Sequence, residues 1–249
     1  MVIYCAGSTK ASRYAAQILK SKGCCIASTP SDAVTHLLLD VPSFGAAGLL
    51  RSGENIDTLL STLPENVIVC GGNLKHPSVE RYRKIDLLQD AHYLAENAYI
   101  TAECALDVAL PYLEVTIRSC PILIIGWGRI GKCLGQLLQN IGADVTISAR
   151  KETDRAMIQA LGFKTMDTGS IKGLDPFRLI FNTVPELVLT KEMAALCRKD
   201  CVKIDLASKT GMDDEDVIVA KGLPGIHFPE SSAELIAATF LRLCREEIL

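Results

Sequence analysis

Short apolar runs alternate with amphipathic helical segments along most of this chain. After the first apolar run, Tyr14, Ile18 and Leu19 fall on one helical face, and Gly23 ends the helical period. The later run PILIIG is wholly apolar, which is typical of a strand at the centre of a parallel sheet. This alternation predicts βαβ units and therefore parallel sheets covered by helices. The predicted strands are MVIYCA, CCIAS, THLLLDV, NVIVCGG, PILIIG, DVTIS, FRLIFNTV, CVKIDLAS and a short one within DVIVAKGLPG.

A long helical segment lies between two such series and predicts a two-lobed α/β protein. Thr101 is expected to cap this helix, with Glu103 near its first turn, and Pro111 is expected to kink or break it. A capping box of Ser231 and Glu234 is expected to begin the last helix. The expected divisions are a flavodoxin-like α/β substrate-side domain at 1–95, a connector helix at 96–118, a doubly wound Rossmann domain at 119–230 and a C-terminal helix at 231–249.

Length and composition narrow the class of protein. The chain has 249 residues, 49% of them apolar, which is enough for one large or two small domains with ordinary cores. The net charge of −3 gives no reason to expect nucleic-acid binding. No apolar run approaches the roughly 20 residues of a membrane span, and the N-terminus lacks a signal-peptide layout, so we expect a soluble, cytoplasmic protein. The ten scattered cysteines favour reduced thiols and show no zinc spacing, so no metal site is expected.

A glycine motif follows the central apolar run. Gly126, Gly128 and Gly131 form G-x-G-x-x-G between a predicted strand and a predicted helix, which is the context that a dinucleotide site requires. The first glycine permits a tight turn, the second lets the backbone approach a pyrophosphate, and the third lets the helix pack on the strand. The first helical turn, with Arg129 and Ile130, would offer its N–H groups to the phosphates.

The end of the next strand indicates which dinucleotide is bound. NAD-binding proteins usually carry an acidic residue there, whereas this chain has Ser148, Arg150 and Lys151. A guanidinium can grip the additional phosphate of NADP with paired charge-assisted hydrogen bonds, and a serine hydroxyl can add another. NADP(H) is therefore the expected cofactor. Glu152 and Asp154 weaken the local positive field and leave NAD as an alternative.

Three later loops follow predicted strands, at the sheet edge where doubly wound folds bind ligands. Asn182 follows one strand, near the expected nicotinamide ribose, and Lys209 follows the next, where it can pair with a substrate carboxylate. The loop KGLPGIHFPESS is fixed by proline and glycine and suggests a pocket wall. No Ser/His/Asp triad occurs, and His227 is more typical of a packing or surface residue. The candidate cofactor-binding residues are Gly126, Gly128, Arg129, Ile130, Gly131, Ser148, Arg150, Lys151, Thr183, Pro185, Leu206 and Ser208.

Several segments together resemble the A subunits of dipicolinate synthases, which form a family related to the two-domain D-2-hydroxyacid dehydrogenases. The glycine motif with its arginine ending, LIIGWGRIGKCLGQLLQNIGADVTISAR, is similar to the family's cofactor turn. The other matching segments are ENAYITAECAL, FNTVPELVL, IDLASKTG and GLPGIHFPESSAELIA. Together they cover most of residues 93–245. Residues 1–92 agree only in pattern, with AGSTK where the family has a glycine-rich first turn.

The resemblance implies a two-lobed fold with a cleft between the lobes, and NADP-linked conversion of dihydrodipicolinate to dipicolinate, the spore-core calcium chelator made in sporulation. It also implies a partner, the flavoprotein-like B subunit, and we expect a homo-oligomer. The candidate catalytic residues are Lys209, Asn182, Asn97 and Thr101. The candidate substrate-binding residues are Lys209, Gly222, Pro224 and Ser231.

The chain departs from the family pattern in ways that bear on its substrate. Cys104 and Glu234 stand where glycines are usual, Glu230 stands where a basic residue can occur, and the stretch between IDLASKTG and GLPG is short. Carboxylates beside a dicarboxylate pocket would repel the substrate unless they point away or are protonated. Two alternatives therefore stay open. One is a D-2-hydroxyacid-dehydrogenase-like enzyme for another small carboxylate, although that family's Arg/Glu/His set is not found at matching positions. The other is a non-catalytic NADP-binding partner protein.

Overall fold

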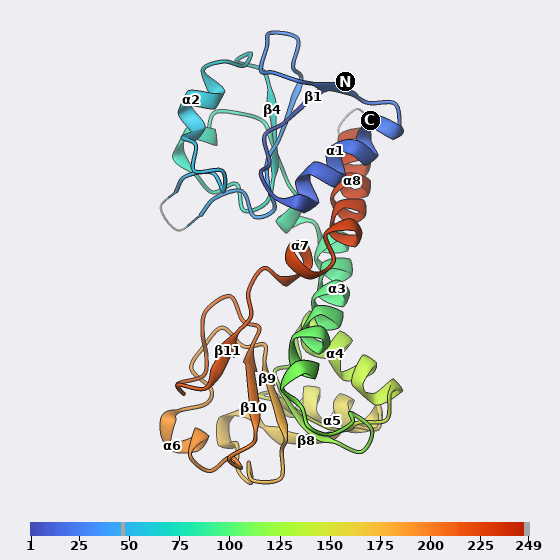
Figure 1. The fold of residues 1–249 in the computed structure, drawn as a ribbon, viewed down its shortest axis with the longest axis vertical. Coiled ribbons are helices and arrows are strands. Elements are labelled where there is room, and N and C mark those ends of the chain that lie inside the picture. The colour runs from blue at the N-terminus through green and yellow to red at the C-terminus, as the bar shows by residue number, and fades with distance from the viewer. Residues whose placement is uncertain (46–47, 247–249) are drawn as a thin grey trace. The chain divides into compact units, whose positions relative to one another are not determined.

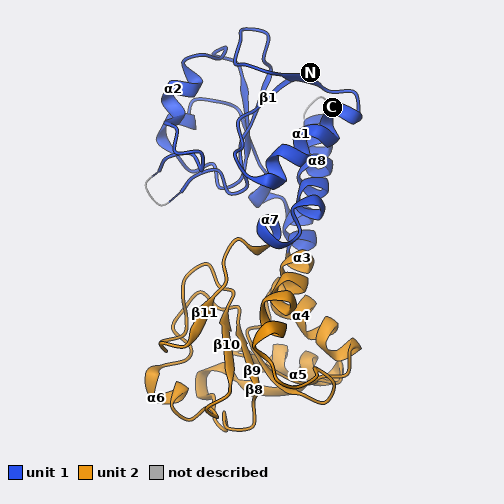
Figure 2. Cartoon of the chain, viewed as in Figure 1, with its two compact units in different colours: residues 1–97, 224–249 blue, residues 98–223 orange. Residues whose placement is uncertain are grey.

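The computed structural model describes residues 1–45 and 48–246 and divides the chain into two compact units (Figure 1, Figure 2). Unit 1 comprises Met1–Asn97 and Pro224–Leu249, and unit 2 comprises Ala98–Leu223. Each unit is built on a parallel sheet with helices, so the predicted α/β class is confirmed. The predicted divisions after residues 95 and 230 differ from the observed ones. The chain returns to unit 1 after Leu223, and the C-terminal helix is part of that unit rather than a separate segment.

Unit 1 has a five-stranded parallel sheet in the order β2-β1-β3-β4-β5, which is the flavodoxin-like order expected from the sequence. The register pairs Ile3 with Ile26 on one side and with His36 on the other. Its elements are β1 (Val2–Cys5), α1 (Lys10–Ser21), β2 (Cys25–Ala27), β3 (His36–Leu38), α2 (Ile56–Leu60), β4 (Ile68–Gly71), η1 (Pro77–Val79), β5 (Lys84–Asp86), η2 (Leu87–Gln89), the start of α3 (Ala91–Ala109), α7 (Leu223–His227) and α8 (Pro229–Glu246).

The C-terminal helix α8 completes the core of unit 1. It packs along α1, and its Ile236 and Phe240 are buried among side chains of that helix and of the sheet, such as Leu19 and Ile3. Figure 1 shows the first and last helices side by side. Arg242 of α8 also donates to Asp90, which precedes α3, at 2.6 Å. Burial of a large apolar side chain contributes about 1.5–3 kcal/mol, so these side chains stabilise the unit.

Unit 2 has a six-stranded parallel sheet in the order β11-β10-β9-β6-β7-β8, which is the predicted Rossmann order. Successive strands are added on one side of β6 as far as β8 and on its other side from β9 onward, so the strand order reverses at β6. There Ile125 pairs with Ser148 on β7 and with Asn182 on β9. Its elements are the remainder of α3, η3 (Leu110–Tyr112), β6 (Pro121–Ile125), α4 (Arg129–Asn140), β7 (Asp144–Ala149), α5 (Glu152–Ala160), β8 (Lys164–Asp167), η4 (Thr168–Ser170), β9 (Leu179–Asn182), α6 (Lys191–Ala194), β10 (Val202–Asp205) and β11 (Val217–Val219).

The central strand β6 is buried on both faces, as its wholly apolar sequence predicts. Ile122 and Ile124 face a cluster that includes Leu134 and Leu138 of α4, whereas Leu123 and Ile125 face a second cluster on the other side of the sheet. Helices or loops therefore cover both faces, and the strand can carry side chains without polar groups. This arrangement fixes the carboxyl end of β6, where the glycine motif begins.

Three local expectations about helices need correction. The helix α3 begins at Ala91, where the Asp90 carboxylate accepts from the Tyr93 N–H at 2.7 Å, so Thr101 lies buried in the helix interior and is not its cap. Pro111 does mark the end of the α-helical part, within the short helix η3. The helix α8 begins at Pro229, two residues before Ser231, so the expected capping box does not start it.

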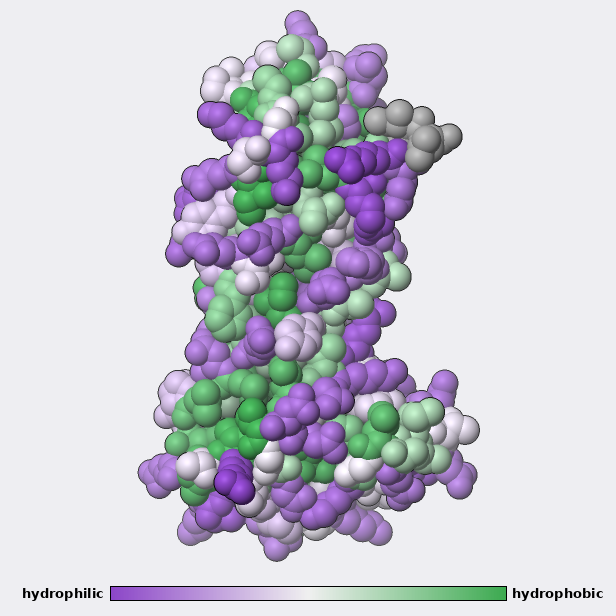
Figure 3. Space-filling view, turned by 90° about the vertical axis from the view of Figure 1, so that its right-hand side faces the viewer, coloured by the Kyte–Doolittle hydropathy of each residue, from purple (hydrophilic) through white to green (hydrophobic). Residues whose placement is uncertain are grey.

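The surface in Figure 3 is a mosaic of hydrophilic and hydrophobic residues on the face shown. Exposed large apolar side chains include Ile141, Met157 and Leu161 in unit 2. Among residues 1–45 and 48–246, no helix combines the length and the apolar character needed to cross a membrane. All ten cysteines belong to the described residues, and no disulfide joins any of them.

Candidate functional site

In the glycine turn after β6, packing requires a glycine at two of the three positions. Gly126 has a φ of +111°, and a Cβ there would lie 2.4 Å from the Thr183 Oγ1. A Cβ on Gly131 would lie 2.2 Å from the carbonyl oxygen of Gly126, so the first turn of α4 packs directly on the strand end. A Cβ on Gly128, by contrast, would meet nothing within 4 Å. Two glycines are therefore required by packing, and the third faces open space.

That open space is a cavity of about 290 Å³ at the carboxyl ends of β6, β7 and β9. No side chain caps α4, because its N-cap residue is Gly128. The positive end of the helix and its first N–H groups therefore face the cavity without a competing side-chain acceptor. The cavity is lined by Gly126, Trp127, Gly128, Ala149, Arg150, Lys151, Asp154, Thr168, Thr183, Val184 and Pro185. Bare backbone, open space and a positive helix end fit a pyrophosphate group.

The end of β7 presents basic groups to this cavity. Arg150 and Lys151 line it, and Arg150 Nη1 lies 3.3 Å from the Glu186 Oε2 across an exposed ion pair. Arg155 is a support: its Nη1 donates to the carbonyl oxygens of Ala149 and Arg150 at 2.9 and 2.7 Å. The guanidinium of Arg155 thus fixes the backbone that carries Arg150, and it leaves the Arg150 side chain projecting into solvent.

Ser148 has a different place from the one expected. Its side chain is fully buried, and its Oγ accepts a hydrogen bond from the Thr168 Oγ1 at 3.0 Å. Thr168 lies in the cavity wall, whereas Ser148 lies behind it. The serine hydroxyl therefore ties β7 to the end of β8 and does not face a ligand, which corrects the expectation that it would add a bond to a bound phosphate.

The side chain of Asn182 forms hydrogen bonds with other groups of the chain. Its Nδ2 donates to the Val184 carbonyl oxygen at 3.0 Å and to the Asp205 Oδ2 at 3.2 Å, and its Oδ1 accepts from the Val184 N–H at 2.9 Å. Asp205 is fully buried and also accepts from the N–H of Ala207 and of Gly211. Asn182 is completely buried, so it shapes the loop after β9 and is a positioning residue rather than a group available to a substrate.

The remaining cofactor candidates lie close to the cavity or behind it. Thr183 and Pro185 are in the wall, and the Thr183 Oγ1 donates to the Ile125 carbonyl oxygen at 3.0 Å. Leu206 is buried below the surface and Ser208 is exposed after β10, and neither lines the cavity. The structure thus brings together most of the predicted cofactor set, with Arg129, Ile130 and Gly131 in the first turn of α4.

The predicted substrate and catalytic residues are divided between the units. Thr101, Lys209 and Gly222 belong to unit 2, and Asn97, Pro224 and Ser231 belong to unit 1. Lys209 is exposed, and it forms no ion pair among residues 1–45 and 48–246. That these residues form one substrate site stays a prediction.

Sequence reasoning left several wall residues out of the candidate set, among them Thr168 and Asp154, and it missed the partner of Arg150. Thr168 was missed because β8 was not predicted: its sequence KTMD contains a single apolar residue and does not alternate in polarity. Asp154 was considered only as a source of negative field, yet it lies in the wall. Glu186 was part of a recognised loop, but only the fold reveals that this loop reaches Arg150.

The corresponding turn of unit 1 is closed by a carboxylate of the chain itself. Asp40 follows β3 and is buried at the N-terminus of α1. Its Oδ2 accepts from the Ser8 N–H at 2.9 Å, and its Oδ1 accepts from the hydroxyls of Thr9 and Ser12 at 2.6 and 2.5 Å. Burial alone would raise the pKa of Asp40, but these hydrogen bonds outweigh it and hold the pKa below its usual value. The Asp40 carboxylate therefore supplies the negative charge at the N-terminus of α1.

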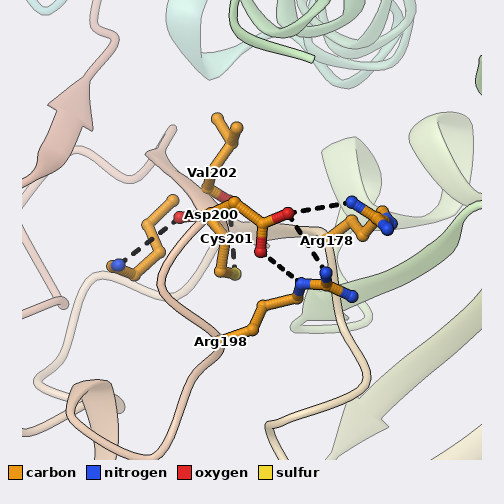
Figure 4. A network of polar contacts seen from close by, with 6 residues as sticks. Arg178, Arg198, Asp200, Cys201 and Val202 are labelled. Atoms are coloured by element: carbon orange, nitrogen blue, oxygen red, sulfur yellow. Dashed lines mark hydrogen bonds and ion pairs between the residues drawn. The ribbon is translucent and has the colours of Figure 1, made fainter. Parts of the chain in front are cut away.

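Two larger cavities lie at the opposite end of the sheet in unit 2, near the start of β10. One, of about 620 Å³, contains the Lys203–Asp214 ion pair at 3.0 Å, and the other, of about 360 Å³, contains Arg178 and Asp200. Figure 4 shows the Asp200 carboxylate held between Arg178 and Arg198. Ligands of doubly wound sheets bind at the carboxyl ends of strands, and these charges are paired with one another. The smaller cavity at Gly126 is therefore the better candidate.

Comparison with known proteins gives a consistent picture. No family model matches the chain. The dipicolinate synthase A subunit of Bacillus subtilis (strain 168) is 23% identical over 243 residues, which cover 90% of this chain and 82% of that protein. The crystal structure of the A subunit of dipicolinate synthase from Bacillus halodurans matches with a TM-score of 0.84 at 20% identity, covering 97% of this chain and 96% of that one. The corresponding crystal structure from B. subtilis matches with a TM-score of 0.82 at 18% identity over 98% and 95%.

The same fold occurs in dehydrogenases. An L-alanine dehydrogenase matches with a TM-score of 0.69, covering 98% of this chain and 80% of that one, and the D-lactate dehydrogenase of Escherichia coli matches with a TM-score of 0.62 over 99% and 96%, both at 11% identity. At this identity the likeness concerns the fold. The resemblance expected from the motifs is thus confirmed: over nearly its whole length, this chain is similar to the dipicolinate synthase A subunit in sequence and fold, within the architecture that these dehydrogenases share.

Proposed function

We propose that this protein is an NADP-dependent oxidoreductase of the same type as the dipicolinate synthase A subunit. The observation that carries the proposal is the open cavity at Gly128, where an uncapped helix N-terminus and a basic strand end face the same space. Gly126, Gly128 and the first turn of α4 would hold the pyrophosphate, and Arg150 with Lys151 would lie by the adenosine ribose. The coarser conclusion, an oxidoreductase with a nicotinamide cofactor, is also supported by the dehydrogenase folds among its structural neighbours.

The proposed reaction is the oxidation of dihydrodipicolinate to dipicolinate. When bound, the nicotinamide of NADP⁺ would accept a hydride, while one proton leaves the ring to solvent or to a base, so that two electrons and two hydrogens are removed. The chain's own contribution would be to orient the two reactants, with Lys209 available to pair with a substrate carboxylate. A flavoprotein-like B subunit, self-association and a cytoplasmic location are parts of the same proposal, based on the similarity to the dipicolinate synthase A subunit.

A non-catalytic NADP-binding partner protein is the second candidate. The fully buried and internally bonded side chain of Asn182 favours it, because this removes one of the four residues expected to act on a substrate. Glu230 and Glu234 do not decide between the candidates, since both side chains are exposed on α8. The two candidates differ in one measurable respect, which is whether a bound dinucleotide is reduced.

The cofactor can be tested by binding. Trp127, the single tryptophan, lies in the cavity wall, so titration with NADPH and NADH is expected to change its fluorescence. Arg150→Gln should weaken NADPH by roughly tenfold, about 1.4 kcal/mol, and leave NADH nearly unchanged. Lys164→Gln is the matched control, because it removes one positive charge at the opposite end of β7 and β8, where Lys164 pairs with Asp144. NADH binding tenfold tighter than NADPH in the unmodified protein would contradict the NADP assignment.

The activity can be tested by following dipicolinate absorbance with dihydrodipicolinate and NADP⁺, with and without a B-type subunit. Dipicolinate formation together with NADPH appearance supports the proposed reaction. Tight NADPH binding with no turnover under either condition favours the non-catalytic candidate. Turnover of another small 2-hydroxy acid instead would identify a dehydrogenase of different specificity.

A further inference from the structure

An ion pair joins two walls of the cavity. Arg150 follows β7 and Glu186 follows Pro185 in the loop after β9, and their Nη1 and Oε2 atoms are 3.3 Å apart. Arg150 and Pro185 both line the cavity. The two side chains are 72% and 64% exposed, so solvent and ligands can reach the pair. The group that is expected to bind the NADP phosphate therefore already has an anionic partner in the chain.

The backbone of Glu186 is held in place by the loop after β10. A Cβ on Gly211 would lie only 2.3 Å from the Glu186 carbonyl oxygen, and the Val188 N–H donates to the Gly211 carbonyl oxygen at 2.8 Å. The buried Asp205 in turn accepts from the Gly211 N–H at 2.7 Å. Because this network fixes the loop, the Glu186 carboxylate is presented to the cavity mouth from a rigid support.

The backbone of Arg150 is held as well. Arg155 donates to the Arg150 carbonyl oxygen at 2.7 Å and forms an ion pair with Asp167 at 3.5 Å. The pair of Arg150 and Glu186 therefore joins two fixed backbones by two flexible, solvent-exposed side chains. Such an exposed pair is weak, so a bound phosphate can replace the carboxylate.

We propose that Glu186 is a specificity-determining residue, which pairs with Arg150 in the free protein and competes with the 2′-phosphate of NADP for its guanidinium. The inference rests on the proposed function, because it requires a dinucleotide in this cavity. A ligand with a 2′-phosphate must break the pair, whereas a ligand with a 2′-hydroxyl leaves it in place. Glu186 therefore reduces the preference for NADP below what an unpaired arginine would give, and the specificity belongs to the pair.

Ligands that contain only the adenosine part of the dinucleotide test this effect without any contribution from the nicotinamide. We would measure adenosine 2′,5′-bisphosphate and AMP by calorimetry, and NADPH and NADH by Trp127 fluorescence, on the full chain. Glu186→Gln is expected to tighten the bisphosphate and NADPH about two- to fivefold and to change AMP and NADH by clearly less. In an Arg150→Gln background, the same substitution should have no selective effect. Glu152→Gln is the charge-matched control, because it removes an exposed carboxylate two residues from Arg150 that is not its ion-pair partner.

Three outcomes would overturn the proposal: unchanged bisphosphate binding in Glu186→Gln, equal tightening of bisphosphate and AMP, or the same selective gain in Glu152→Gln. An equal gain for both ligands would mean a general charge effect at the cavity mouth. Absence of a dinucleotide site gives a different result, since then NADPH, NADH and both adenosine ligands would all fail to bind to the unmodified protein by calorimetry. In that case the role assigned to Glu186 is also wrong.

Discussion

The two units contain the same structural device, a helix that starts just after the first strand of a parallel sheet, but they use its N-terminus in opposite ways. In unit 1, the Asp40 carboxylate accepts from Ser8, Thr9 and Ser12 at the start of α1. In unit 2, no side chain caps α4, and the space beside Gly128 is open. The same positive helix end is therefore neutralised by the chain in one unit and left for a ligand in the other.

The residue that makes the difference lies on the neighbouring strand. Asp40 follows β3, which pairs with β1, and it reaches across to α1. Thr183 and Val184 follow β9, which pairs with β6, and neither supplies a carboxylate: the Thr183 hydroxyl donates to the Ile125 carbonyl oxygen instead of accepting from the helix. A carboxylate at this place fills an anion site, whereas a hydroxyl turned toward the strand leaves it empty. A glycine-rich turn is thus informative only together with the end of the adjacent strand.

The largest effect is expected from Gly131→Ala compared with Gly128→Ala. The added Cβ at residue 131 would lie 2.2 Å from the Gly126 carbonyl oxygen, so we expect a loss of about 3 kcal/mol in the free energy of unfolding. Gly128 has a φ of −78° and open space, so its alanine variant should keep its stability within about 0.5 kcal/mol. The same variant should weaken NADPH by at least about tenfold, because the new methyl group occupies the proposed pyrophosphate position.

Urea unfolding followed by circular dichroism measures the stability of both glycine variants, and Trp127 fluorescence measures their affinity for NADPH. The informative result is a separation of the two quantities, with stability lost in one variant and affinity lost in the other. A Gly128→Ala variant that binds NADPH as tightly as the unmodified protein would mean that no pyrophosphate approaches this glycine, and the contrast between the units would lose its functional meaning.

Asp40→Asn should have the next largest effect and should test the closed turn of unit 1. Removing the charge from a buried carboxylate with several donors is expected to cost about 2 kcal/mol. Because the pKa of Asp40 is lowered in the folded state, its stabilising contribution is fully present above the ordinary carboxyl pKa of about 3.9 and is lost as the pH falls through the lowered value. The difference in stability between the two proteins should therefore shrink in acid.

The same variant tests whether an emptied turn becomes a ligand site. A Cβ on Gly7 would lie 2.4 Å from the Ser12 Cβ, so the turn is crowded even without the charge. Calorimetry should accordingly still find one NADPH per chain in Asp40→Asn. A second bound NADPH, or a stability difference that persists unchanged to low pH, would contradict this view of unit 1.

Local sequence patterns predicted what depends on nearby residues. The apolar strand PILIIG, the three glycines and the basic end of β7 were all correctly placed, because strand burial and turn geometry follow from residues within one βαβ unit. The alternation of strands and helices predicts a parallel sheet in each unit, but it does not fix the strand order, because the two units share the alternation and differ in order. The membership of α8 in unit 1 was not predictable in this way, because it depends on packing against α1 more than 200 residues earlier.

The hydrogen-bond and ion-pair partners of the polar site residues could be identified only from the folded structure. Asn182 is bonded to Asp205 and Arg150 to Glu186, at separations of 23 and 36 residues, and nothing in the local sequence distinguishes these side chains from ligand-binding ones. A polar residue at a strand end can face the ligand or the adjacent loop with the same sequence pattern. Only the distance to its partner decides between the two roles.

Ser148→Ala should have the smallest effect and tests this last point directly. The buried hydroxyl accepts one hydrogen bond, from the Thr168 Oγ1, so its removal is expected to lower the free energy of unfolding by about 1 kcal/mol. The ratio of NADPH to NADH affinity should stay unchanged, since the hydroxyl is behind the cavity wall. Thr168→Val, which removes the donor from the wall itself, is the companion variant. A selective loss of NADPH binding in Ser148→Ala would mean that this serine contacts the phosphate after all, and that β7 and β8 separate when the ligand binds.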